Sequence, residues 1–218
     1  MIDPSDVTVV LPCRNEAQSL PSVLDAVPDG YHRLVVDNGS TDGTADVARA
    51  HGAQVVVEAV PGYGSAVHAG IIAARTTVVA VMDGDGSMDP RELPGLVAAL
   101  DSAQLVVGRR RPVHRSGSPW HARLGNTAIA WRLRRRLKID VHDIGALRVA
   151  RRDDLLSLDV PDRRSGYPLQ LLVLAARAGW TVVEHDISYR PRTGGVSKVS
   201  GSVRGTVVAV WDFAKVIP

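Results

Sequence analysis

Two aspartates two residues apart, Asp83 and Asp85, follow a short apolar run at Val78–Met82. The run is rich in β-branched residues and stops at Asp and Gly, which predicts a buried strand. Ligands bind at the carboxyl ends of strands in α/β sheets, and paired carboxylates there suit a hard cation, Mg²⁺ or Mn²⁺. An isolated Asp-Gly-Asp is equally typical of a plain turn, so the rest of the chain must decide between the two interpretations.

The first half of the chain alternates predicted strands with predicted helices. This alternation is typical of a mostly parallel central sheet with helices on both faces, and we expect a single α/β domain over residues 1–218. The predicted strands are Val7–Pro12, His32–Val36, Ala53–Val57, Val78–Met82 and Gln104–Val107. The predicted helices are Glu16–Val27, Ala45–Ala50, Ser65–Ala74 and Pro90–Leu100.

Most of these strands are followed by polar or charged residues. Because the carboxyl ends of parallel strands meet at one edge of a sheet, we expect these side chains to form a single site. They are Arg14, Asn15 and Glu16 after the first strand, Asp37 after the second, Asp83 and Asp85 after the fourth, and Arg109 and Arg110 after the fifth.

The second half of the chain is less regular. Helices are expected at Trp120–Leu137 and Tyr167–Ala178, and strands at Ile144–Val149, Trp180–Val183 and Ile187–Tyr189. Two further segments are a Gly-rich basic loop, Arg192–Lys198, and an amphipathic tail, Val203–Ile217.

The composition is that of a globular protein, with 45% hydrophobic and 22% charged residues among 218. The single cysteine, Cys13, excludes an internal disulfide and a cysteine-rich metal site. The N-terminus does not resemble a signal peptide, and no apolar run reaches the roughly 18–20 residues that span a bilayer. We therefore expect a cytoplasmic protein, and contact with the inner face of a membrane stays open.

Basic residues are concentrated between Arg109 and Lys138, where ten Arg and Lys occur without an acid. Such a segment indicates an anionic partner, either phosphate groups, acidic lipid headgroups or nucleic acid, unless it is simply a solvated helix face. The chain has no zinc-finger or RRM signature and only 4% aromatic residues, so nucleic acid is disfavoured.

Seven segments in order resemble the family-two glycosyltransferases of the GT-A (Rossmann-like) fold, most closely the dolichyl- or polyprenyl-phosphate mannose or glucose synthases. They cover nearly the whole chain. They are VVLPCRNEAQSLPSVL, VVDNGSTDGTADVA, PGYGSAVHAG, VMDGDGSMDP, VVGRR, HDIGALR and GYPLQLLVLAARAGWTVVEHDISYRPRTGGVSKVSG. Asn38 stands where the family usually has a second acid, and the loop PGYGSAVHAG lacks its usual basic residue.

The resemblance implies a nucleotide-sugar half, residues 1–110, and an acceptor half, residues 111–218, with a C-terminal amphipathic helix. It implies three sets of site residues. The nucleotide-sugar set is Pro12, Arg14, Glu16, Asp37, Asp83, Asp85, Arg192, Ser197 and Lys198. The metal set is Asp83, Asp85 and Ser87, and the catalytic set is Asp143, Arg110 and Arg123.

The implied reaction is metal-dependent, inverting transfer of a sugar from a GDP-mannose or UDP-glucose type donor to a polyprenyl phosphate. A leaving diphosphate needs a cation and fixed donors, and the chain is rich in Arg, whose planar fork binds phosphate. A soluble or protein acceptor, a sugar-phosphate nucleotidyltransferase and a non-enzymatic anion-binding module remain alternatives. The oligomeric state stays open.

Overall fold

The computed structural model describes residues 2–113, 131, 134–137, 139–145 and 147–193. Its strands form one seven-stranded sheet in the order β3-β2-β1-β4-β6-β5-β7. All pairings are parallel except those of β6 with β4 and β5, which confirms the mostly parallel sheet. The strands are β1 Val7–Cys13, β2 His32–Asp37, β3 Gln54–Val57, β4 Val78–Val81, β5 Leu105–Pro112, β6 Arg148–Arg151 and β7 Val182–Tyr189.

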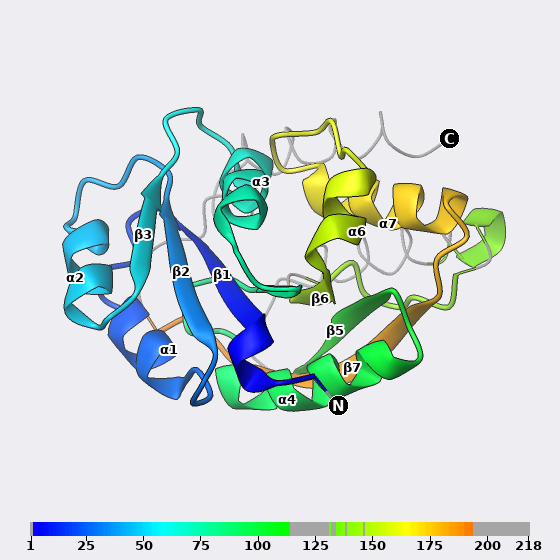
Figure 1. The fold of residues 1–218 in the computed structure, drawn as a ribbon, viewed down its shortest axis with the longest axis horizontal. Coiled ribbons are helices and arrows are strands. Elements are labelled where there is room, and N and C mark those ends of the chain that lie inside the picture. The colour runs from blue at the N-terminus through cyan, green and yellow to red at the C-terminus, as the bar shows by residue number, and fades with distance from the viewer. Residues whose placement is uncertain (1, 114–130, 132–133, 138, 146, 194–218) are drawn as a thin grey trace.

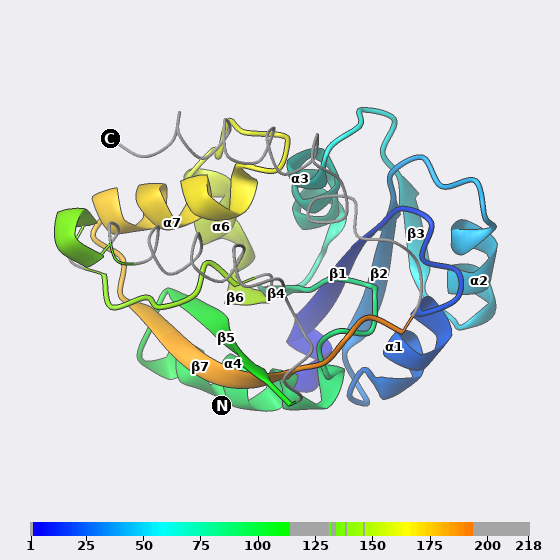
Figure 2. The ribbon, with the colours of Figure 1, turned by 180° about the vertical axis from the view of Figure 1, so that it is seen from behind.

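Helices cover both faces of the sheet (Figures 1 and 2). One hydrophobic cluster joins the sheet to α1, α2 and α4, and a second joins the opposite face to α3, α6 and α7. The helices are α1 Leu20–Ala26, α2 Thr44–Ala50, α3 Tyr63–Ala73, α4 Leu93–Ala98, α6 Arg152–Ser157 and α7 Tyr167–Arg177, with 3-10 turns at Pro4–Asp6, Pro90–Glu92 and Ala99–Asp101. No helix among the described residues is long and apolar enough to cross a membrane.

The strand order reverses direction between β1 and β4. The chain moves outward from β1 to β2 and β3, and then returns to place β4 on the other side of β1. Such a switch point opens a crevice at the carboxyl ends of the two strands, where α/β proteins bind ligands. The loop after β1 and the two aspartates after β4 therefore face one crevice.

Four differences from the predicted elements bear on the site. The first helix begins at Leu20 rather than Glu16, because Asn15 has a φ of 57° and the chain turns before the helix starts. The strand predicted at Ile144–Val149 is β6, Arg148–Arg151, and it runs antiparallel. The two strands predicted at the C-terminal side are one strand, β7.

The fourth difference is the length of β5, which was predicted to end at Val107 and continues to Pro112. It pairs with β7 from Leu105–Val182 to Pro112–Tyr189. Beyond Val107, β5 carries three consecutive arginines, and two of them, Arg109 and Arg111, pair with Asp186 of β7. The predicted basic helix lies largely outside the described residues, and the amphipathic tail lies wholly outside them.

Candidate active site

The two aspartates after β4 differ in their surroundings. Asp85 is 4% exposed; its Oδ1 accepts the Ser87 N–H at 2.9 Å, and its Oδ2 accepts Arg192 Nη2 at 2.8 Å. Burial and the charge of Asp85 raise the pKa of Asp83 well above its ordinary value, an effect that nearby arginines only partly offset. Two carboxylates held so close together favour a cation between them.

Ser87 supplies a further oxygen beside these carboxylates. Its hydroxyl is buried and has no hydrogen-bond partner among the described residues. No three His, Cys, Asp or Glu side chains in the described part of the chain gather to hold a metal ion by themselves. Mg²⁺ is commonly held by one or two carboxylates and completed by substrate phosphates, so Asp83, Asp85 and Ser87 fit such an ion.

The segment after β7 covers the aspartate turn. Arg190 donates its N–H to the Ser87 carbonyl at 2.9 Å, and Thr193 donates to the Asp85 carbonyl at 3.1 Å. Gly86 has a φ of +75°, and a Cβ there would come within 2.5 Å of Thr193 Oγ1. Only glycine suits this contact. The structure thus brings Arg192 to the site, whereas Ser197 and Lys198 lie outside the described residues.

The loops after β1 and β2 are joined to each other and to the aspartate turn. Ser19 Oγ donates to the Gly84 carbonyl at 2.9 Å, and Thr41 donates its N–H to Asn15 Oδ1 at 2.8 Å. Asp37 is 8% exposed and accepts the Ser40 N–H at 3.1 Å. The predicted nucleotide residues of these loops, namely Pro12, Arg14, Glu16 and Asp37, lie at the same sheet edge as the aspartates, with Arg14 exposed.

Asn38 connects the loop after β2 to the entrance of α3. Its Nδ2 donates to the carbonyls of Glu58 and Val60 at 2.9 and 2.8 Å, and its Oδ1 accepts the Gly62 N–H at 2.9 Å. A carboxylate cannot donate to two carbonyls. These contacts explain why an amide suits this position better than the acid usual in the family.

The half-buried Arg110 and the buried Asp143 form an ion pair through two hydrogen bonds. Arg110 Nε and Nη2 donate to Asp143 Oδ2 and Oδ1 at 2.8 and 2.7 Å, and the Arg110 backbone N–H also donates to Oδ2. Gly145 donates its N–H to Oδ1. Burial alone would raise the pKa of Asp143, but the hydrogen bonds and charge of Arg110 outweigh it and hold the pKa below its ordinary value. Asp143 is therefore an orienting partner of Arg110 and a poor proton acceptor.

Three residues at the site escaped the sequence analysis. The Tyr189 ring lies 5.4 Å from the Arg110 guanidinium carbon, and Glu184 accepts the Asp143 N–H at 2.8 Å. Arg148, 3% exposed, donates to the Ile144 and Gly145 carbonyls. Arg148 is a single charge among apolar neighbours, whereas Glu184 and Tyr189 belong to a polar stretch that is also typical of a solvated strand face.

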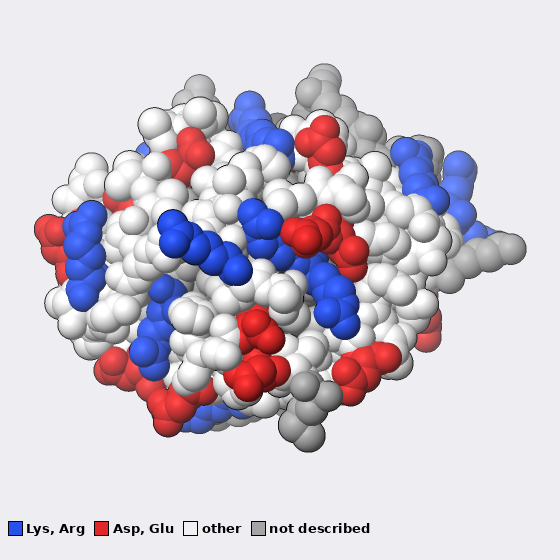
Figure 3. All heavy atoms as spheres, in the orientation of Figure 1, with Lys and Arg blue, Asp and Glu red and all other residues white. Residues whose placement is uncertain are grey.

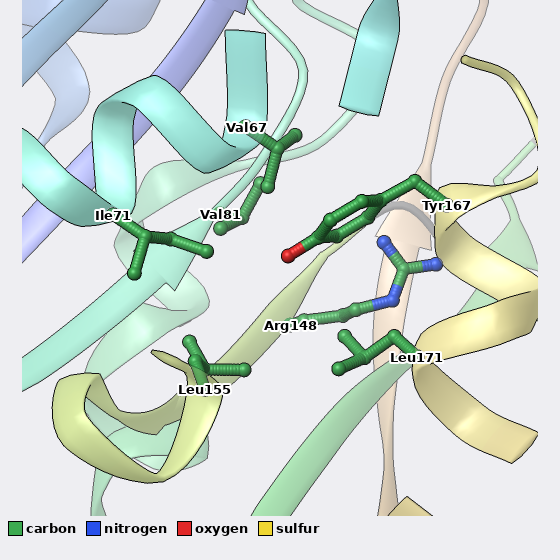
Figure 4. A pocket seen from close by; sticks show the side chains of 7 residues that line it. All are labelled: Val67, Ile71, Val81, Arg148, Leu155, Tyr167 and Leu171. Carbon is green, nitrogen blue, oxygen red and sulfur yellow. The ribbon is translucent and has the colours of Figure 1, made fainter. Parts of the chain in front are cut away.

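Arg148 reaches from β6 alongside Tyr167 of α7 (Figure 4). The two side chains line a cavity of about 10 Å³ that is otherwise apolar, room for about one water molecule. The β4–β6 register places Arg148 opposite Val81, two residues before Asp83. The charge of Arg148 lowers the pKa of Asp83 against the effect of burial.

Charges of both signs are interspersed over the face seen in Figure 3. In the described part of the basic segment, Arg111 pairs with Asp186 at 2.8 Å, and Arg109 lies 3.9 Å from both Asp186 and Glu184. These acids from β7 offset part of the positive charge expected there. Arg123 lies outside the described residues.

Comparison with known proteins agrees with this architecture. The sequence model of glycosyl transferase family 2 matches residues 8–156. An uncharacterized glycosyltransferase of Mycobacterium tuberculosis is 66% identical over 212 residues, 97% of each chain. A polyprenol monophosphomannose synthase of Mycolicibacterium smegmatis is 35% identical over 217 residues, covering 89% of this chain and 81% of its own.

Solved structures show the same fold. Glucosyl-3-phosphoglycerate synthase from Mycobacterium tuberculosis, in complex with Mn²⁺, uridine diphosphate and glucosyl-3-phosphoglycerate, superposes with a TM-score of 0.76 at 23% identity. The match covers 97% of this chain and 79% of that one. Together with the family match, the GT-A fold and its site at the strand ends show that this chain is a glycosyltransferase that belongs to glycosyl transferase family 2.

Proposed function

We propose that this enzyme transfers a sugar, with inversion, from a GDP-mannose or UDP-glucose type donor to a polyprenyl phosphate, with Mg²⁺ or Mn²⁺ bound. The observation that carries the proposal is the pair of Arg110 and Asp143 beside the two aspartates. Asp143 is committed to Arg110, so the site offers a fixed guanidinium and no free base at that position. A phosphate acceptor needs neutralisation by such a group, whereas a hydroxyl acceptor needs a base.

The reaction exchanges one bond to the anomeric carbon for another. The bond from that carbon to the donor diphosphate breaks, and a bond to an acceptor phosphate oxygen forms; no proton must be removed, because that oxygen is already anionic. Asp83, Asp85 and Ser87 would hold the cation, which supplies positive charge for the leaving diphosphate. Arg192 and Arg110 would neutralise phosphate oxygens, since guanidinium groups bind them through paired hydrogen bonds.

The nucleotide would lie over the loops after β1 and β2, near Pro12, Arg14, Glu16 and Asp37. Residues 1–110 then form the donor half and residues 111–218 the acceptor half, with Arg123, Ser197, Lys198 and the C-terminal amphipathic segment as further contributors. The names of relatives at 33–35% identity support the lipid acceptor. The likeness to glucosyl-3-phosphoglycerate synthase, solved in complex with phosphoglyceric acid, favours a soluble phosphorylated acceptor as the second candidate.

A matrix of donors and acceptors tests the proposal. The purified chain with Mn²⁺ is given UDP-glucose or GDP-mannose together with a short-chain polyprenyl phosphate, 3-phosphoglycerate or no acceptor. We expect labelled sugar to enter the organic phase only with the polyprenyl phosphate. Transfer to 3-phosphoglycerate alone would establish the second candidate, and no transfer from any donor would refute both.

We also propose that the acceptor half contacts the inner face of the membrane. Trp131 is 52% exposed, and the Arg135 guanidinium carbon lies 5.0 Å from its ring, an arrangement that suits the headgroup layer. Each basic residue near an anionic surface contributes about 1 kcal/mol. Flotation with vesicles should show binding that rises with the anionic lipid fraction and falls with salt; no binding to strongly anionic vesicles at low salt would contradict it.

A further inference from the structure

We propose that Glu184 is a positioning residue that orients Arg110 by fixing the turn that carries Asp143. The inference rests on the proposed function only in taking Arg110 as a group that binds phosphate. Glu184 lies on β7, outside the aspartate turn, and its side chain is 9% exposed.

The Glu184 carboxylate accepts three hydrogen bonds from two consecutive residues. Its Oε1 accepts the backbone N–H groups of His142 and Asp143 at 2.6 and 2.8 Å. Its Oε2 lies 2.9 Å from His142 Nδ1. A buried backbone N–H that loses its partner costs as much free energy as a lost hydrogen bond, so this carboxylate determines where the turn lies.

The position of the turn at His142 and Asp143 then determines where the Asp143 carboxylate meets Arg110. Asp143 contacts the edge of the guanidinium that carries Nε and Nη2. The opposite edge, with Nη1, is thereby directed away from Asp143, and the Arg110 side chain remains 31% exposed. Arginine binds phosphate through such an edge, and its geometry is rigid. The orientation of this edge is therefore the quantity that Glu184 controls.

Strand β7 supports Arg110 from two positions. Glu184 acts through the turn, and Tyr189, five residues later, lies beneath the guanidinium. Arg110 itself is opposite Ile187 in the β5–β7 register. The guanidinium therefore meets the Asp143 carboxylate at one edge and the Tyr189 ring on one face, and these contacts limit its movement.

A matched control lies on the same strand. Asp186 is two residues from Glu184 and on the same face of β7, but it is 53% exposed; it pairs with Arg111 and shares Arg109 with Glu184. Asp186→Ala removes an acid from this face without touching the turn. Glu184→Gln keeps an oxygen for both backbone N–H groups and places an amide against His142 Nδ1, which can accept from it.

Two measurements test the inference on the full chain: calorimetric binding of inorganic pyrophosphate with Mn²⁺, and initial transfer rates. Glu184→Ala should weaken pyrophosphate binding and lower kcat/KM by at least about 10-fold, as loss of an orienting partner does. Glu184→Gln should stay within about threefold of wild type, and Asp186→Ala within about twofold. If Glu184→Ala shows no thermal unfolding transition, and so is not folded, Glu184→Asp replaces it. Its side chain is too short to reach the turn, and it should show the same loss.

A double-mutant cycle separates action through Asp143 from general packing. On an Asp143→Ala background, Glu184→Ala should add less than about twofold, because both changes release the same guanidinium. If the fold-losses of the two single variants multiply in the double variant, the inference is overturned. It is also overturned if Glu184→Ala binds pyrophosphate as tightly as Asp186→Ala does. Pyrophosphate binding needs no sugar acceptor, so this measurement decides the inference even where the transfer assay refutes the proposed function. A wild-type protein that binds no pyrophosphate would overturn the inference.

Discussion

Asp85 and Asp143 are equally buried aspartates, 4% and 5% exposed, but their carboxylates have different partners. Asp85 accepts one backbone N–H and one guanidinium nitrogen through its carboxylate and sits near a second acid. Asp143 accepts four N–H groups, three of them from Arg110. The donor region, which is Asp83, Asp85 and Ser87, has carboxylate oxygens for the proposed cation. The Arg110 region, which is Arg110 and Asp143, uses its carboxylate to hold a guanidinium of the chain itself.

The comparison teaches that burial does not determine what a carboxylate does. The number and sign of its partners decide. In the donor region burial, together with the charge of Asp85, raises the pKa of Asp83. In the Arg110 region the guanidinium outweighs burial, and the pKa of Asp143 falls. Changing single partners in each region should separate these two roles.

The largest expected effect follows loss of a donor-region carboxylate. Asp85→Asn removes charge where a cation would bind, and kcat/KM should fall by at least about 100-fold, the scale seen when a key electrostatic group is lost. Initial rates over a Mn²⁺ titration measure it. Asp89→Asn, in the same turn but capping a 3-10 helix, is the control. Undiminished transfer in excess chelator would contradict the metal assignment.

Loss of Asp143 should reduce activity less and stability more. Asp143→Asn turns an amide toward Arg110, and we expect activity to fall by about 10- to 100-fold and the free energy of unfolding by about 1–3 kcal/mol. Because the pKa of Asp143 is lowered by folding, its stabilisation is complete above the unfolded pKa of about 3.9 and is lost as pH falls below it. Urea unfolding should therefore show a larger difference between wild type and variant at pH 7 than at pH 3. Equal stabilities at pH 7 would refute the role.

Arg192 tests whether the segment after β7 serves the donor region. Arg192→Gln removes the guanidinium that contacts Asp85, and we expect donor KM to rise by about 10-fold with a smaller change in kcat. Arg190→Gln is the matched control, because Arg190 is 57% exposed and lies 3.9 Å from Asp89. Similar donor KM values for both variants would show that Arg192 does not serve the donor.

The donor region was largely predictable from the sequence, and the Arg110 region was not. Asp37, Asp83 and Asp85 come at the ends of apolar runs and are followed by Asn or Gly, so the local pattern predicts their place at a sheet edge. Glu184 and Arg148 act on residues about 40 positions away or across an antiparallel strand pair. The local sequence does not determine the direction of a strand. It also does not determine which face of a polar strand lies toward the site, because β5 and β7 carry charged or polar residues on both faces.

The smallest effect on activity is expected at Asn38, which links the donor region to α3. Asn38→Asp restores the acid usual in the family, but it places a carboxylate against the Glu58 and Val60 carbonyls, to which only an amide donates. The free energy of unfolding should fall by about 1–3 kcal/mol, while kcat/KM below the unfolding transition stays within about threefold of wild type, because no proposed ligand contact is lost.

The stability of Asn38→Asp should also depend on pH. Burial against carbonyls should raise the pKa of the new carboxyl, so the loss of stability should grow as pH rises through the unfolded pKa of about 3.9 and beyond. The pKa shift is opposite to that at Asp143, but the loss of stability grows with rising pH at both positions, because one variant removes a stabilising carboxylate and the other introduces a destabilising one. Unfolding of both variants across pH 3 to 8 therefore sharpens the comparison, and a loss at position 38 that shrinks with rising pH would show that the amide is not needed as a donor there.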